Sequence, residues 1–212
     1  MRLREMLRLT RAPFAPTAAW DVLGATALAL AAGGRSVASL GLTAWTLLAL
    51  TAVFVYAAGM VLNDLVDRER DRTLAPDRPI PRGDIPVRVA VLLFVVLAAG
   101  ASLLGGGPAG DARLVWAAIV FSMLYDAFAK ASVAGGALTL GLARGANAAV
   151  GVLPLVLARV APAWTLLGPL AIGLYAAAVT LWSTTEEEAA PLRRVVARVL
   201  VLLAFLLAGL LS

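Results

Sequence analysis

Long apolar segments separated by short polar ones make up most of the chain. A helix needs about 20 mostly apolar residues to cross the hydrocarbon core of a membrane, and seven segments approach that length. They are residues 17–34, 38–62, 87–105, 114–129, 133–158, 163–182 and 195–211. The pattern predicts an all-α, polytopic transmembrane helical bundle in which residues 1–212 form a single domain.

The composition supports this fold class. Hydrophobic residues account for 61% of the chain and charged residues for 15%, and the mean hydropathy is +0.90. Soluble domains are far less apolar, so we expect an integral membrane protein. The basic N-terminal residues run into the first apolar segment without a small-residue cleavage site, so no cleaved signal peptide is expected.

The basic residues are distributed unevenly between the two ends of the predicted helices. If the N-terminus is cytoplasmic, 14 of the 18 lysines and arginines fall on the cytoplasmic side, in agreement with the positive-inside rule. The isoelectric point near 10.7 is explained by this topology and by contact with anionic membrane lipid, rather than by binding of nucleic acid. The expected location is a bacterial inner (plasma) membrane, with the N-terminus and the polar loops in the cytoplasm.

A cluster of acids follows the second apolar segment, from Asn63 to Asp71. If the helix continues through this stretch, each residue turns by about 100°, so Asn63, Asp67 and Asp71 stay within an arc of about 80°. Asp64 falls at the edge of the same arc, whereas Glu69 points to the far side. The arc therefore presents a ligand face made only of oxygen atoms.

Such a face suits Mg²⁺, which binds carboxylate and carbonyl oxygens and shares its remaining positions with water and phosphate. The chain has no histidine and no cysteine, which argues against a zinc or thiolate site. The four residues of the arc are therefore candidate Mg²⁺ ligands. The alternative is a solvated loop in which the neighbouring arginines neutralise the acids.

Two arginines follow in a loop rich in proline, Arg78-Pro79-Ile80-Pro81-Arg82-Gly83. Proline restricts its own backbone and that of the residue before it, so the loop is predicted to be stiff. Guanidinium groups bind phosphate oxygens in a bidentate manner, which makes Arg78 and Arg82 candidate diphosphate ligands. Arginine beside proline also occurs in cytoplasmic loops as a plain topology signal.

Together these motifs resemble the first signature of the UbiA superfamily of intramembrane prenyltransferases, NDxxDxxxD followed by RPxxxG. Here the signature reads Asn63-Asp64-x-x-Asp67-x-x-x-Asp71 and then Arg78-Pro79-Ile80-x-x-Gly83. The stretch Arg8-Leu9-x-Arg11-Ala12-Pro13 is similar to the basic, proline-marked lead into the family's first helix. Residues 125–130 and 140–147 are similar in particular to the EboC-like branch.

The resemblance implies Mg²⁺-dependent transfer of an isoprenyl group from an isoprenyl diphosphate donor to a small-molecule or lipid acceptor. The motif residues from Asn63 to Asp71 would bind metal and diphosphate, while Arg78 and Lys130 would contact diphosphate oxygens. The expected catalytic residues are Asp64, Asp67, Lys130 and Tyr125, the last facing the cavity. Phe121, Phe128 and Tyr56 are candidates for stabilising an allylic cation, with ordinary packing as the alternative.

The fifth apolar segment contains two polar residues, Arg144 and Asn147, which share a helix face. A charge at membrane depth normally faces a cavity or a partner. Arg144 and Asn147 are therefore also candidate diphosphate ligands, and the alternative is that Arg144 pairs with Asp126 or with a helix end. Gly141-x-x-x-Gly145 would let another helix approach closely.

The sequence departs from the family pattern in two places. Where the family has a second acidic motif, DxxxD, this chain has Ser183-Thr184-Thr185-Glu186-Glu187-Glu188. Glu187 is a candidate ligand for a second Mg²⁺, and a solvated acidic cap is the alternative. The resemblance also implies nine transmembrane helices, whereas seven are readable, so we expect the last two to be missing.

Three classes of function remain open. A prenyltransferase needs Asp64 and Asp67 for transfer. A carrier of a polar-headed isoprenoid lipid binds its ligand without releasing diphosphate. A non-catalytic membrane subunit derived from such an enzyme associates with other pathway enzymes and needs no metal.

Overall fold

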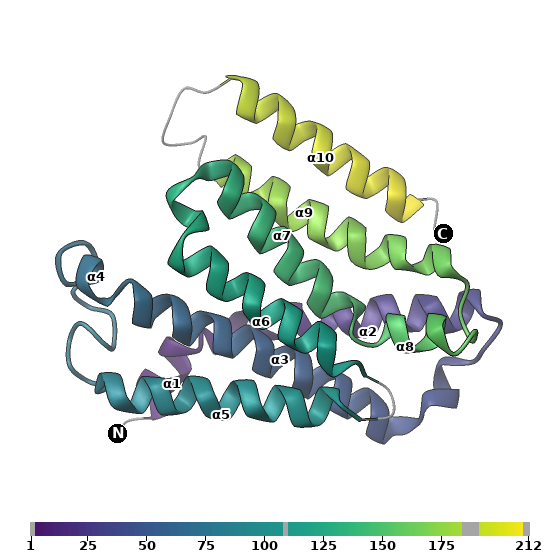
Figure 1. Ribbon diagram of the computed structural model, residues 1–212, viewed down its shortest axis with the longest axis horizontal. Helices are drawn as coiled ribbons and strands as arrows, with labels where there is room; N and C mark the ends of the chain where they lie inside the picture. The colour runs from purple at the N-terminus through teal and green to yellow at the C-terminus, as the bar shows by residue number, and fades with distance from the viewer. Residues whose placement is uncertain (1–2, 108–109, 184–190, 210–212) are drawn as a thin grey trace.

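The computed structural model describes residues 3–107, 110–183 and 191–209, and the regular elements in these ranges are all helices (Figure 1). The α-helices are α1 (Leu3–Leu9), α2 (Ala15–Ala32), α3 (Gly41–Val66), α4 (Arg68–Leu74), α5 (Val87–Gly105), α6 (Ala112–Ala127), α7 (Val133–Ala149), α8 (Val152–Leu157), α9 (Leu167–Ser183) and α10 (Pro191–Gly209). Short 3-10 turns connect them: η1 (Ala12–Phe14), η2 (Val37–Leu40), η3 (Ala129–Ala131) and η4 (Ala163–Leu166).

Each apolar segment predicted from the sequence coincides with a helix or a pair of helices, which confirms the all-helical fold. By length and composition, four of the described helical stretches can cross a membrane: Ala12–Ala32, Val37–Val66, Val87–Gly105 and Ala163–Ser183. α6 and α7 are apolar but shorter, at 16 and 17 residues, and α10 contains the apolar stretch Val195–Leu207. A count of seven spans stays a prediction.

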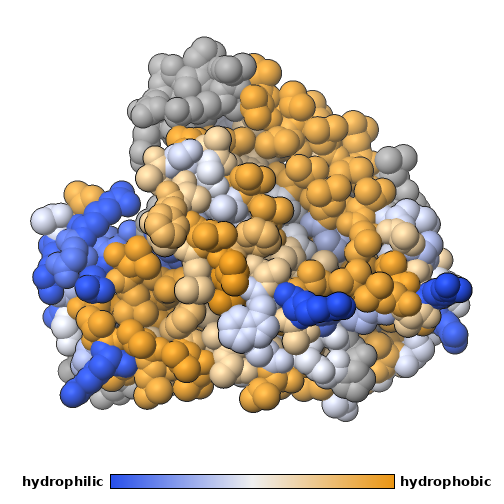
Figure 2. Space-filling model, in the orientation of Figure 1, coloured by the Kyte–Doolittle hydropathy of each residue, from blue (hydrophilic) through white to orange (hydrophobic). Residues whose placement is uncertain are grey.

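α3 and α7 are the central helices, and each packs against several others. α3 packs against α2, α5 and α6, whereas α7 packs against α2, α6 and α9, and α10 lies on the outer side of α9 (Figure 1). The main core lies where α2, α3, α5, α6 and α7 meet, and it contains Val22, Leu48, Val115 and Val150. Figure 2 shows apolar residues over most of the visible surface, with strongly hydrophilic residues gathered mainly at the end that carries α4. This surface is suited to contact with lipid.

The fifth apolar segment is divided between α7 and α8 instead of forming the single helix that the sequence suggested. Pro154 has no amide hydrogen to donate to the carbonyl of Val150, so the helical ladder is interrupted there. A side chain at Gly151 would meet the Thr26 hydroxyl at 2.3 Å. The interruption therefore lies where the chain passes close to α2.

α7 and α9 touch through their backbones. A Cβ atom added at Gly141 would lie 2.7 Å from the carbonyl oxygen of Gly173, and one added at Gly173 would lie 2.8 Å from that of Gly141. One turn further on, the Cβ of a substituted Gly145 would lie 3.2 Å from the carbonyl oxygen of Pro169. This glycine seam confirms the packing role expected for Gly141 and Gly145.

Substitution at the seam should separate the two helices. Gly141→Ala is expected to lower the thermal unfolding midpoint, because overpacking against backbone costs about 1–3 kcal/mol and exceeds the gain of about 1 kcal/mol in helix propensity. Gly24→Ala in α2 is the matched control, since no heavy atom lies within 4 Å of the added Cβ, and it should leave the midpoint unchanged or raise it. Both are measured by thermal unfolding in detergent, and an equal response of the two variants would contradict the assignment.

Candidate functional site

The acidic cluster lies where α3 passes into α4, at the end of the bundle that also holds α1 (Figure 1). The Asp67 amide donates to the Asn63 carbonyl at 2.9 Å, and the Asp71 amide donates to the Asp67 carbonyl at 2.8 Å. Helical hydrogen bonding therefore continues across the junction, as the predicted arc requires. Asp64 and Asp71 are only 3% and 5% exposed, whereas Asn63 and Asp67 are half-buried.

Arg78 joins two of these carboxylates. Its Nη1 atom donates to Asp71 Oδ2 at 2.5 Å and to Asp64 Oδ1 at 3.4 Å. The loop holds it there because Ile80 and Ile85 are buried in a cluster with residues of α1, α3 and α5. The proline-rich loop is thus anchored by apolar contacts.

Arg11 reaches the same cluster from the other side. Its Nη2 atom donates to Asn63 Oδ1 at 3.3 Å and to Asp64 Oδ1 at 3.4 Å, and its Nη1 atom lies 3.4 Å from the sulfur of Met60. Arg11 has a φ of 47°, in the left-handed backbone region that residues other than glycine rarely adopt. From this turn before α2, the guanidinium extends to Asn63 and Asp64.

Asp126, at the end of α6, belongs to the cluster as well. Its Oδ1 atom accepts a hydrogen bond from Asn63 Nδ2 at 2.7 Å, and the same amide donates to Asp67 Oδ2 at 3.3 Å. The residue is 3% exposed. From the sequence, Asp126 was expected at most as a partner of Arg144, although an acid near the end of an apolar segment was the available signal.

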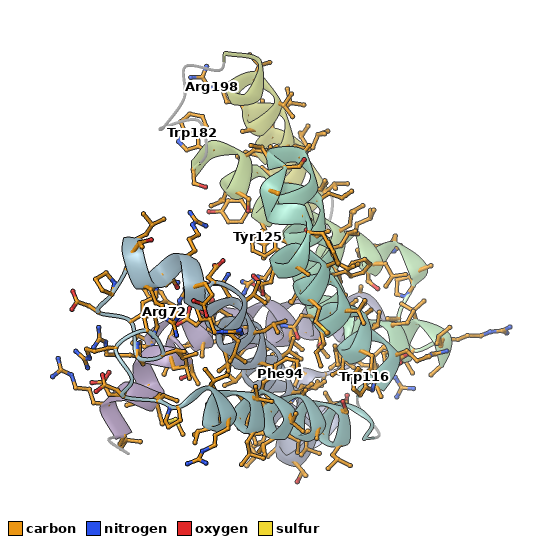
Figure 3. All side chains as sticks on the ribbon, turned by 60° about the vertical axis from the view of Figure 1, so that its left-hand side comes forward. Arg72, Phe94, Trp116, Tyr125, Trp182 and Arg198 are labelled. Atoms are coloured by element: carbon orange, nitrogen blue, oxygen red, sulfur yellow. The ribbon has the colours of Figure 1, made fainter. Side chains whose placement is uncertain are left out.

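The two tyrosines considered from the sequence lie on α6 and α3. Tyr125 on α6 lies within electrostatic range of Asp126, Asp67 and Arg11, and Figure 3 shows it on the side of α6 turned towards α3 and α4. Tyr56 on α3 lies within electrostatic range of both Arg11 and Arg144. Tyr125 therefore lies beside the acids, whereas Tyr56 packs against the main apolar core.

Arg82 and Arg144 have partners other than the acidic motif. Arg82 pairs with Asp84 and, at 3.4 Å, with Glu5, and its hydrogen bond to Asp84 raises the pKa of the guanidinium. Arg144 pairs with Asp21 of α2. The alternative in which Arg144 pairs with Asp126 is wrong, because the described ion pair of Arg144 is with Asp21.

The remaining candidates are only partly described. Lys130 lies in η3, and its side chain falls outside the described residues, as does Glu187. Phe128 is 75% exposed and Phe121 is half-buried.

A surface hollow of about 560 Å³ lies against α1 and η1, beside this site. It is lined by Leu3, Arg4, Leu7, Arg8, Arg11, Pro13 and Phe14. Arg11 thus borders both the hollow and the acidic cluster.

The cluster contains Asn63, Asp64, Asp67, Asp71 and Asp126, which offer oxygen ligands only. Among the described residues, no group of three or more acids is arranged to hold a metal ion by itself. The set therefore fits a hard cation held by one or two carboxylates, with water and phosphate oxygens in the other positions.

The sequence matches the UbiA prenyltransferase family over residues 22–211. This chain belongs to the UbiA prenyltransferase family. It is an integral membrane protein, as the apolar helices and the family both indicate. The narrower similarity to the EboC-like branch stays a prediction.

Several family members are similar to parts of the chain. A 4-hydroxybenzoate octaprenyltransferase of Methylibium petroleiphilum is 37% identical over 103 residues, which cover 46% of this chain and 31% of that protein. The DMOA farnesyltransferase nvfB of Aspergillus novofumigatus is 38% identical over 82 residues, covering 37% and 26%. A digeranylgeranylglyceryl phosphate synthase of Halobacterium salinarum is 50% identical over 48 residues, covering 23% and 17%. The matched stretches thus span less than a third of each relative.

Solved structures confirm the fold over nearly the whole chain. A digeranylgeranylglyceryl phosphate synthase superposes with a TM-score of 0.71 at 22% identity, covering 98% of this chain and 76% of that one. A UbiA homologue from Archaeoglobus fulgidus bound to GPP and Mg²⁺ superposes with a TM-score of 0.67 at 16% identity, covering 98% and 75%.

The stability of the fold should depend on Arg78, because it pairs with two buried carboxylates. Arg78→Ala leaves Asp71 without its guanidinium partner and is expected to reduce the free energy of unfolding by about 1–3 kcal/mol. Arg72→Ala is the control, because Arg72 pairs with Glu69 at the surface and such pairs contribute at most about 1 kcal/mol. Denaturant unfolding in detergent separates the two, and an equal loss in both variants would show that Arg78 has no special structural role.

Proposed function

We propose that this protein is a Mg²⁺-dependent intramembrane prenyltransferase that acts on an allylic diphosphate. The observation that carries the proposal is the arrangement around Asp64, where Arg11 and Arg78 converge from two separate elements on one buried carboxylate. Family membership supports the reaction class. The Archaeoglobus fulgidus homologue, solved with GPP and Mg²⁺, supports the donor and the metal.

In the proposed reaction, the carbon–oxygen bond of the donor breaks and the diphosphate leaves with the bonding electrons. The isoprenyl carbon then bonds to the acceptor, which loses a proton. Mg²⁺, when bound, would neutralise charge that develops on the leaving diphosphate.

Arg11 and Arg78 would exchange their contacts with the carboxylates for diphosphate oxygens. This exchange leaves oxygens of Asp64 and Asp71 available as metal ligands, with Asn63 and Asp67 beside them. We include Arg82 and Lys130 as further diphosphate ligands, Tyr125 as a residue facing the donor, and Glu187 as a ligand of a second ion.

We also propose that the end of the bundle carrying the acidic cluster faces the cytoplasm of a bacterial cell. The uneven distribution of arginine between the two ends supports this orientation. The partners would be the isoprenyl diphosphate donor, a small-molecule or lipid acceptor and the surrounding lipid. Contact with other enzymes of the pathway stays a proposal of the same kind.

A carrier or a non-catalytic subunit is the second candidate function. The pairing of Asp64 and Asp71 with arginine favours it, since no group of three described acids stands ready for a metal. A carrier would bind the isoprenoid diphosphate without breaking its carbon–oxygen bond.

Release of diphosphate distinguishes these functions. The purified protein in lipid, given Mg²⁺, a panel of allylic diphosphates and membrane extract as the acceptor source, should release diphosphate from at least one donor. Asp67→Ala should reduce the rate by about 100-fold or more, the order expected when electrostatic stabilisation of a transition state is lost. Removal of Mg²⁺ by EDTA should have a similar effect.

Asp77→Ala is the matched control, because Asp77 is an exposed acid of the loop after α4. It should release diphosphate at the rate of the unchanged protein. Release that survives both Asp67→Ala and EDTA would contradict the proposed site. Binding of donor without release by a folded protein would favour the carrier.

A further inference from the structure

A second polar group lies inside the bundle, separate from the acidic cluster. Asp21 is the only charged residue of α2, and its carboxylate pairs with Arg144 of α7. Their side chains are 22% and 25% exposed. Asn147 follows one turn later on the same face of α7 and is 3% exposed.

One buried oxygen atom of this group lacks a hydrogen-bond donor. Asn147 Oδ1 accepts no hydrogen bond from a described residue, whereas Asp21 Oδ2 is in contact with Arg144 Nη2. A buried acceptor without a donor costs about 1–3 kcal/mol.

Packing alone does not require these residues. Val150, one turn beyond Asn147, lies in the same apolar cluster as Ala18 and Val22, which flank Asp21 on α2. α2 and α7 therefore already meet through apolar side chains. Charges within a membrane helix are costly and normally face a cavity or a partner. Arg144 and Asp21 partner each other, but the buried amide oxygen of Asn147 is left without a described donor, and for that reason the group is better explained as a binding site than as a structural contact.

The group lies deeper than the acidic cluster. α7 begins at Val133, directly after η3 and the end of α6 that carries Asp126. Arg144 lies 11 residues further along α7, or about 16 Å along the helix axis. A molecule held beside Arg144 would therefore lie further into the bundle than the diphosphate.

The charges of the group indicate its ligand. Asp21 cancels the charge of Arg144, so the pair offers little attraction to a diphosphate, which carries several negative charges. Asn147 Oδ1 needs a donor, and an ionised diphosphate has none to give. A hydroxyl group can donate to Asn147 Oδ1 and accept from Arg144.

We propose that Asp21, Arg144 and Asn147 form a subsite for an uncharged, hydroxyl-bearing headgroup, that of the prenyl acceptor. The identification of the ligand as the prenyl acceptor rests on the proposed function. The inference that the ligand is uncharged and bears a hydroxyl group does not. It replaces the assignment of Arg144 and Asn147 to the diphosphate that the sequence suggested.

Binding can be measured without turnover in the full chain reconstituted in nanodiscs. The hydroxyl probes are octyl glycerol ether and 4-octylphenol. Their charged counterparts are octyl phosphate and the anion of 4-octylbenzoic acid, and geranyl diphosphate with Mg²⁺ is the donor. The unchanged protein should bind at least one hydroxyl probe more tightly than either charged counterpart. Preference for a charged probe, or no binding of a hydroxyl probe, would overturn the proposal before any variant is made.

Two variants then locate the site. Asn147→Leu removes the amide at similar size, and Asp21→Asn with Arg144→Gln removes both charges together, so neither leaves an unpaired buried charge. Each should lower the affinity for the hydroxyl probe by about tenfold or more, which corresponds to about 1.4 kcal/mol of binding free energy. The affinity for geranyl diphosphate should stay within about twofold of that of the unchanged protein.

The matched control is Asp111→Asn with Arg113→Gln. This ion pair, 2.6 Å long, caps the start of α6 at the opposite end of that helix from Asp126, and its removal should not change binding of either probe. Loss of geranyl diphosphate affinity in the two interior variants would instead assign these residues to the donor. Equal affinity for the hydroxyl probe in all variants would show that Asp21, Arg144 and Asn147 have only a structural role, and would overturn the proposal. Absence of prenyl transfer with intact, selective hydroxyl binding would reject the proposed function and leave this subsite standing.

Discussion

Asp64 is a nearly buried carboxylate at the end of a long apolar helix, and its pairing with two guanidinium groups makes that position tolerable. Arg11 comes from the turn before α2, and Arg78 comes from the loop after α4. A buried charge without partners would be strongly destabilising, so both segments must dock on α3 for the helix to end as it does. The apolar anchors Ile80 and Ile85 and the left-handed backbone at Arg11 follow from this requirement.

The sequence predicted the helices well because an apolar run of membrane length has few other folds available. It also predicted the acidic arc, since helical periodicity alone places Asn63, Asp67 and Asp71 on one side. It did not predict that Asp126 would join them, or that Asp21 would pair with Arg144. The two partners are separated by 63 positions in the first contact and by 123 positions in the second. Such contacts depend on which helices become neighbours, and the periodicity within one segment does not determine that.

The two polar regions differ in charge and therefore in the chemistry they suit. Around Asn63, four carboxylates and two guanidinium groups surround one end of the bundle, a mixture that a cation and a polyanion can rearrange together. Around Asn147, the charges of one acid and one base cancel, and the interaction still to be satisfied is a hydrogen bond to the Asn147 amide oxygen. Such a separation gives a membrane protein a charged compartment near water and a neutral one deeper in the bundle.

The glycine seam has a consequence for the side of the bundle that faces lipid. Because Gly141 and Gly173 meet main chain to main chain, the separation of α7 and α9 is set by peptide geometry and not by the volume of any side chain. Leu138, Leu142, Leu170 and Tyr175, which point outward, can therefore change in size without moving the helix axes. The outer surface of this pair is free to adapt to membranes of different lipid content while the inner residues of α7 keep their positions.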